Sequence, residues 1–158
     1  MKIFDARDVI QFAVRIEEDG EAFYRKAALV AEDKDTQDLF NFLADEEIQH
    51  KAIFREMLSK METLRPAETY DGEYTAYLSE YIDGKVIFTN DVKQGRAPDT
   101  KDTSSAIIFA MQREADSILY YHEAKRFIAE KYYEIIDKII IEERKHFSKL
   151  SELRKKYA

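Results

Sequence analysis

The chain has 158 residues, a formal net charge of −7 and no cysteine. This length fits one domain with its own core, and the 36% of charged residues is typical of long, solvated helices. Four glycines and two prolines are too few for the many turns of an all-β fold. The acidic balance disfavours nucleic acid as a partner, because a phosphate backbone attracts basic faces. The missing cysteines exclude disulfides, thiolate metal sites, iron–sulfur clusters and cysteine nucleophiles.

The N-terminal stretch MKIFDARDVIQF lacks the long apolar run of a secretory signal. No other stretch has the apolar length that is needed to cross a bilayer. We therefore expect a cytoplasmic protein without a membrane partner.

Two long helices are predicted first along the chain, at residues 5–32 and 36–63, because apolar residues recur there at helical spacing. Asp5, with Asp8 three positions on, is the expected N-cap of the first helix. The polar stretch DKDT separates the two helices, and Asp35 within it is the expected cap of the second.

Residues 64–102 differ from the helices because they contain both prolines and three of the four glycines. We expect a long crossover there, in which the stretch YTAYLSEYI at 74–82 could form a short helix. A third helix is predicted over 103–129 and a fourth over 132–156. Neither Gly nor Pro marks the break near 129–132, and only an internal repeat reveals it.

That repeat links the two halves of the chain. RIEEDGEAFYRKA at 15–27 resembles QREADSILYYHEA at 112–124, with an offset of 97 residues. DEEIQH at 45–50 matches IEERKH at 141–146, with an offset of 96 residues. Two helix pairs joined by a long connection form a four-helix bundle with one crossover. The sequence therefore predicts an all-α bundle that forms a single domain over 1–158.

Each half carries one Glu-x-x-His motif, with Glu47 and His50 in EIQH and Glu143 and His146 in ERKH. At positions i and i+3, the two side chains of each motif share one face of a helix. A single motif of this kind usually marks a solvated surface pair. Here two copies stand at equivalent places in a repeat and use two of only three histidines, which favours a metal site.

Glu17 and Glu114 occupy equivalent positions in the first and third helices, on stripes expected to face the interior. One Glu from each of two helices, with Glu-x-x-His from each of the other two, is the ligand pattern of di-metal carboxylate proteins. Four carboxylates balance two divalent cations, whereas without metal they repel and some take up protons. Oxygen and imidazole donors suit iron, manganese or zinc, and we expect two iron ions first. The expected ligands are Glu17, Glu47, His50, Glu114, Glu143 and His146.

Tyr24 and Tyr121 lie two turns beyond Glu17 and Glu114, on the same helix faces. They either pack in the core with a buried hydroxyl or act as supporting catalytic residues. In the second case each would bond a metal ligand or relay electrons.

Three further residues are expected outside the ligand set. Glu46 and Glu142 each precede a ligand glutamate by one position, about 100° away around the helix. We place them in an outer position or in solvent. His122 has Leu119 in place of a glutamate three residues before it, so it is expected at the surface or in a helix contact.

With these motifs the chain resembles the ferritin-like superfamily and, within it, the rubrerythrin-like branch of di-iron carboxylate proteins. The resemblance rests on EEDGEAFY with LADEEIQH and on READSILYY with IEERKH, and it covers all four long helices. It implies a ferritin-like four-helix bundle, the six ligands above, and Glu47 and Glu143 as the bridging pair.

The chain departs from the family pattern at several positions. Rubrerythrins carry a rubredoxin-type iron module with four cysteines, and this chain has none, so its electrons would come from an external donor. Rubrerythrins also place a further metal glutamate three residues after the third-helix ligand, where this chain has Ser117, and its first-helix counterpart is Gly20. Ile48 replaces the haem-binding methionine of bacterioferritins, so no haem is expected. The fifth helix of cage-forming ferritins is not expected either.

Three functions are compatible with these features. The first is a di-iron oxidoreductase of ferroxidase or peroxidase type, which reacts with O₂ or H₂O₂. The second is iron storage of the ferritin type, which requires a shell of many subunits. The third is metal binding without turnover. The resemblance also suggests a homodimer.

Overall fold

The computed structural model describes residues 5–61, 76 and 102–157 of the chain. These ranges contain four long α-helices and two short 3₁₀ turns but no strand, so the predicted all-α fold is confirmed. Apart from Ala76 and Asp102, the predicted crossover and its short helix lie outside the described residues. The elements in chain order are α1 (Ala6–Val30), α2 (Lys34–Lys60), α5 (Thr103–Ala124), η2 (Lys125–Phe127), η3 (Glu130–Tyr132) and α6 (Tyr133–Lys156).

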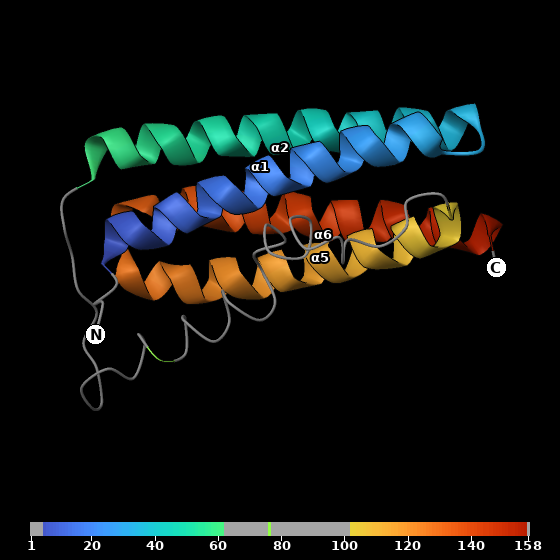
Figure 1. Ribbon diagram of the computed structural model, residues 1–158. Helices are drawn as coiled ribbons and strands as arrows, with labels where there is room; N and C mark the ends of the chain where they lie inside the picture. The colour runs from blue at the N-terminus through green and yellow to red at the C-terminus, as the bar shows by residue number, and fades with distance from the viewer. Residues whose placement is uncertain (1–4, 62–75, 77–101, 158) are drawn as a thin grey trace.

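The long helices form two antiparallel pairs, α1 with α2 and α5 with α6, which lie against each other as two layers (Figure 1). Contacts of α1 with α5 and of α2 with α6 join the layers. α2 and α5 run in the same direction, so the end of α2 and the start of α5 lie at opposite ends of the bundle (Figure 1). This is the predicted ferritin-like arrangement of two helix pairs.

Aspartates at the N-caps set the first two helix starts. Asp5 accepts hydrogen bonds from backbone amides of the first turn, and the Asp8 carboxylate accepts one from the Asp5 amide at 3.3 Å, which confirms the predicted cap. The predicted cap of α2 is wrong. Asp33, and not Asp35, has extended backbone and accepts from the Thr36 amide at 3.0 Å. Asp35 lies in the first turn instead, where its charge favours the helix dipole.

The break between the last two helices is made by apolar residues. α5 ends at Ala124, five residues before the predicted end, and η2 continues it. Ile128 and Ala129 then take extended backbone conformations, with ψ of 160° and 146°. Phe127 and Ile128 are both buried, so packing turns the chain where neither Gly nor Pro does.

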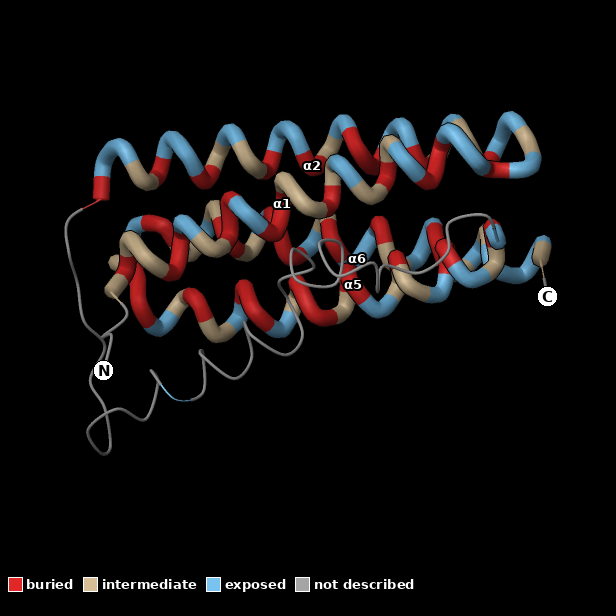
Figure 2. The backbone as a smooth tube through the Cα atoms, viewed as in Figure 1, coloured by how far each residue is buried: buried red, intermediate tan, exposed pale blue. Residues whose placement is uncertain are grey.

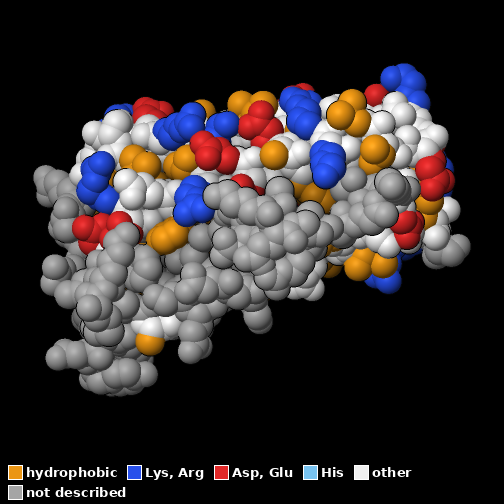
Figure 3. All heavy atoms as spheres, in the orientation of Figure 1, with side chains coloured by type: hydrophobic (Ala, Val, Ile, Leu, Met, Phe, Trp, Pro, Cys, Tyr) orange, Lys and Arg blue, Asp and Glu red, His pale blue; other side chains and the backbone are white. Residues whose placement is uncertain are grey.

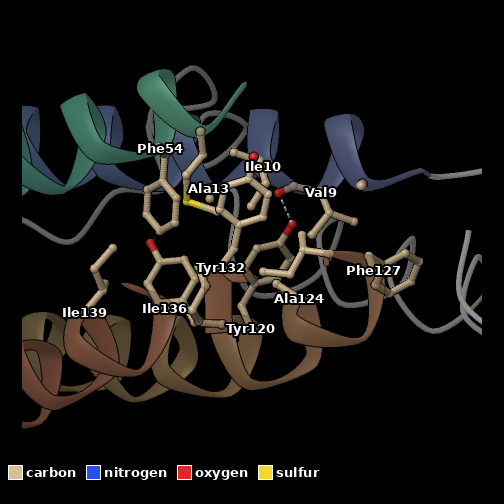
Figure 4. Close-up of a cluster of buried hydrophobic side chains, with 14 of the residues drawn as sticks. Val9, Ile10, Ala13, Phe54, Tyr120, Ala124, Phe127, Tyr132, Ile136 and Ile139 are labelled. Atoms are coloured by element: carbon tan, nitrogen blue, oxygen red, sulfur yellow. Dashed lines mark hydrogen bonds between the residues drawn. The ribbon is translucent and has the colours of Figure 1, made fainter. Parts of the chain in front are cut away.

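The buried positions of each helix lie mainly on the face turned toward the other helices (Figure 2). They form two apolar clusters at different levels of the bundle. The first cluster includes Val9, Phe54, Tyr120 and Ile136 (Figure 4), where the Tyr120 hydroxyl donates to the Val9 carbonyl at 2.7 Å.

Between the two clusters, every long helix buries polar side chains at the same level. Burial of polar groups is unfavourable unless they are paired, so this belt is the place where a site is expected. Its members are Glu17, Glu47, His50, Arg113, Glu114, Ser117, Glu143 and His146.

The described surface carries both signs of charge among scattered apolar side chains on the face shown in Figure 3. Among the described helices, none combines the length and the apolar character needed to span a membrane.

Candidate metal centre

The structure brings all six predicted ligand residues together in the polar belt. Their donor atoms form two groups, and in each group the atoms lie within 4.8 Å of one another. Glu47 and Glu143 belong to both groups, as expected of a bridging pair. The first group is Glu17, Glu47, His50 and Glu143, and the second is Glu47, Glu114, Glu143 and His146.

Both histidines turn Nδ1 toward the carboxylates. Nδ1 of His50 lies 2.7 Å from Oε1 of Glu143 and 3.6 Å from Oε2 of Glu17. Nδ1 of His146 lies 3.7 Å from Oε2 of Glu143 and 3.8 Å from Oε2 of Glu114. The two imidazole rings stack with their centroids 5.8 Å apart. Each ring therefore presents one nitrogen to a common centre.

The other ring nitrogen faces an outer carboxylate from the opposite half. Nε2 of His50 lies 2.6 Å from Oε2 of Glu142, and Nε2 of His146 lies 3.7 Å from Oε2 of Glu46. A carboxylate in this position fixes the ring and makes the other nitrogen a better donor. Glu46 and Glu142 thus take the outer position, but each serves the histidine of the other helix pair.

The two tyrosines also reach across the bundle. The Tyr24 hydroxyl donates to Glu114, and the Tyr121 hydroxyl donates to Glu17. Burial and the neighbouring carboxylate raise the pKa of both phenols, so they remain protonated donors. Both tyrosines are buried, and each makes the predicted hydrogen bond to a candidate metal ligand.

Burial raises the pKa of all four carboxyl groups, and interactions with neighbouring side chains then make their pKa values differ. The pKa of Glu47 is raised well above its ordinary value, and that of Glu114 is raised to about 7. For Glu17 and Glu143, neighbouring side chains outweigh burial: Glu47 and His50 lower the pKa of Glu17, and Glu114 with the two histidines lowers that of Glu143 to about 2. The four crowded carboxyl groups therefore differ in how readily they take up a proton in the metal-free centre.

Several buried oxygen and nitrogen atoms of this centre make no hydrogen bond of good geometry to any described residue, although Nδ1 of His50 and Oε1 of Glu143 lie within ion-pair distance. Such atoms are rare in folded proteins and call for an ion or another partner. Oxygen and imidazole donors in two groups that share two carboxylates fit two divalent cations. The atoms are Oε2 of Glu17, Glu47 and Glu114, both carboxylate oxygens of Glu143, and Nδ1 of His50 and His146.

Arg113 is a member of the centre that the sequence reading missed. Its Nη1 donates to Oε1 of Glu47 at 2.9 Å and lies 3.7 Å from Oε1 of Glu114. Its Nη2 donates to the Ile16 carbonyl at 2.6 Å. A Cβ atom at Gly20 would lie 1.9 Å from Nη2, so only glycine leaves room for the guanidinium. The repeat contained an indication that Arg113 is buried, because Arg113 is equivalent to the apolar Ile16 of the first half.

Other candidates lie outside the cluster. The Ser117 hydroxyl donates to the Arg113 carbonyl at 3.0 Å, a bond within its own helix. His122 is exposed, and its Nε2 lies 3.5 Å from Nη2 of Arg144, as predicted for a surface residue in helix contact.

A four-helix bundle with buried carboxylates and histidines grouped in this way defines a ferritin-like protein of the di-metal carboxylate class. The chain belongs to the rubrerythrin family, which it matches over residues 8–154. It is also similar to a solved structure from Thermotoga maritima, described as a ferritin-like diiron-carboxylate protein. The two are 25% identical with a TM-score of 0.73, over 100% of this chain and 99% of that one. No curated protein matches the chain.

Proposed function

We propose that the six residues hold two iron ions and that the protein is an oxidoreductase of ferroxidase or peroxidase type. It reacts with O₂ or H₂O₂ and draws electrons from an external donor. The observation that carries the proposal is the set of buried donor atoms without hydrogen bonds, in two groups that share Glu47 and Glu143. Iron is proposed before manganese or zinc because the similar Thermotoga maritima protein is described as diiron.

In this proposal Glu47 and Glu143, which belong to both groups, would contribute to holding both ions. Glu17 and His50 would help to hold one ion, and Glu114 and His146 the other. Iron ions bound in these positions would supply electrons to the oxidant and regain them from the donor.

The remaining residues of the centre hold the ligands and the protons. The tyrosine hydroxyls orient Glu114 and Glu17, and Glu142 and Glu46 orient the imidazoles. Burial and the neighbouring carboxylates raise the pKa of Glu47 in the metal-free centre, so binding of a cation there would favour release of a proton. The apolar clusters on either side keep the reacting groups out of bulk water.

Anaerobic loading with Fe(II), followed by exposure to O₂ or H₂O₂, tests this function. We expect two Fe(II) per chain and the growth of ferric absorbance within minutes. Reduction by an artificial donor should restore Fe(II), and a second addition of oxidant should repeat the cycle. Persistence of bound Fe(II) after exposure to both oxidants would reduce the protein to a metal binder without turnover.

Size-exclusion chromatography separates this function from iron storage. We propose a homodimer in the cytoplasm, which cannot enclose a mineral core. Elution as a shell of many subunits would favour storage of the ferritin type instead.

A further inference from the structure

Arg113 places a positive charge in the centre, and this residue has no charged counterpart in the other half of the repeat. Among the described residues, it is the only buried Lys or Arg, with 1% of its surface exposed. The equivalent position on α1 is Ile16, 97 residues earlier. The donors of the two halves are matched, but the guanidinium is present once.

The surrounding residues hold the guanidinium in place. Nη2 donates to the Ile16 carbonyl, and the missing side chain of Gly20 provides the space. The Tyr24 ring lies 5.7 Å from the guanidinium carbon, within range of a cation–π contact. Arg113 is therefore a fixed part of the centre.

The guanidinium lies closer to one group of donors than to the other. It bonds Glu47, which both groups share, at 2.9 Å and lies 3.7 Å from Glu114, which belongs only to the group of His146. The charge of Glu114 raises the pKa of Arg113 more than the charge of Glu17, which belongs only to the group of His50.

A fixed positive charge opposes a divalent cation most strongly at the nearer position, because charges in a buried site are poorly screened. We propose that Arg113 makes the two metal positions unequal, so that a divalent cation binds more tightly beside His50 than beside His146. This rests on the proposed metal-binding function and specifies the order in which the centre fills. Arg113 is thus a positioning residue that sets metal occupancy.

Anaerobic titration with Co(II), followed by visible absorption and calorimetry, tests this order. The wild-type protein should bind two Co(II) in steps that differ by more than about tenfold in affinity. Arg113→Met should bring the two steps to within about threefold of each other, whereas Arg113→Lys, which keeps the charge, should retain most of the separation. His50→Ala should remove the tight step, and His146→Ala should remove the weak one.

Each of three results would overturn the proposal: equal affinities in the wild-type protein, an unchanged separation in Arg113→Met, or loss of the tight step in His146→Ala. If Arg113→Met does not fold, the two histidine variants still decide the order, and Gly20→Ala displaces the guanidinium without removing its charge. The ratio of the two Co(II) affinities should then change, and an unchanged ratio refutes the proposal. Binding of two Co(II) with equal affinity refutes only this proposal, whereas failure to bind any refutes the proposed function as well.

Discussion

The two helix pairs of the bundle supply the centre with almost the same parts. Each pair contributes one inward glutamate, one Glu-x-x-His motif, one tyrosine and one outer carboxylate. The tyrosine and the outer carboxylate serve the opposite pair, so neither half forms a site alone. The equivalent residues are Glu17 and Glu114, Tyr24 and Tyr121, Glu46 and Glu142, Glu47 and Glu143, and His50 and His146.

The halves differ at the positions that the repeat leaves unmatched. Arg113 stands opposite Ile16, and Ser117 stands opposite Gly20. These differences lie in one place, because the guanidinium from α5 fills the space at Gly20 on α1. In the proposed function the matched residues would hold the cations, and the unmatched ones would make the two metal positions differ.

The largest effect is expected from the two glutamates shared by both groups. Glu47→Ala or Glu143→Ala should weaken the binding of both metal ions by more than about a hundredfold, beyond the usual loss for an outer residue. Glu17→Ala is the matched control, because it removes a donor from one group only and should affect mainly one ion. Metal counting by mass spectrometry after dialysis measures this, and full two-metal occupancy in Glu47→Ala would contradict the ligand assignment.

The two histidines should link stability to pH in the same direction. Burial lowers the pKa of His146, but the Glu114 and Glu143 carboxylates outweigh it and raise the pKa from 6.5 to about 10. The unfolded chain releases this proton near pH 6.5 and the folded one near pH 10, so the folded state binds more protons between them. The stabilisation is complete below pH 6.5 and is lost as the pH rises to about 10.

The His146 contribution alone should therefore lower the unfolding free energy of the metal-free protein by on the order of 2–3 kcal/mol between about pH 6.5 and pH 9. Urea denaturation in the presence of a chelator measures this loss. His146→Gln should flatten the pH dependence in that range. His50→Gln should flatten it in the same range, because the Glu143 and Glu17 carboxylates outweigh burial and raise the pKa of His50 still further, so only the unfolded chain releases that proton. The two variants should differ only near pH 10, where His146 loses its proton in the folded state. Equal slopes in His146→Gln and the wild-type protein would contradict the assignment.

Substitutions at Gly20 and Ser117, which are equivalent but unlike positions of the repeat, should differ in their effect on stability. Gly to Ala inside a helix usually stabilises by about 1 kcal/mol. Gly20→Ala should instead destabilise the metal-free protein by about 2 kcal/mol, because the new methyl group displaces a guanidinium that is bonded to a buried carboxylate. Ser117→Ala removes only a hydroxyl bonded within its own helix and should change stability by less than about 0.5 kcal/mol.

Denaturant unfolding of both variants checks this contrast. The double variant Gly20→Ala with Arg113→Met should be more stable than the sum of the two single effects, because the steric conflict is removed. Additive effects would show that the two residues act independently.

The helices and the six ligand candidates could be predicted because their signals are local or repeated. Apolar spacing marks each helix, i and i+3 spacing places Glu47 and His50 on one face, and the repeat supplies Glu143 and His146. The resulting bundle and the convergence of these residues agree with the structure.

Contacts that depend on the rotation of one helix against another could not be read in this way. Tyr24 lies two turns from Glu17 in its own helix, yet it bonds Glu114. Arg113 adjoins Glu114 in the sequence, and from the sequence alone it resembles a solvated charge. Only the structure shows that Gly20 leaves space for its guanidinium. Packing, rather than a local signal, also ends α5, because the buried Ile128 turns the chain.

The smallest effect on metal binding is expected from the outer carboxylates. Both halves supply a glutamate to this position, but the two glutamates lie at different distances from their histidines. Glu142 lies 2.6 Å from Nε2 of His50, whereas Glu46 lies 3.7 Å from Nε2 of His146. Glu142→Gln should therefore weaken metal binding beside His50 by about tenfold, because an amide holds and polarises the ring less well than a carboxylate. Glu46→Gln should change binding beside His146 by less than about threefold, since the longer contact contributes less. Co(II) titration of the two variants measures both steps, and a larger loss in Glu46→Gln would show that metal binding shortens the contact of His146 with Glu46.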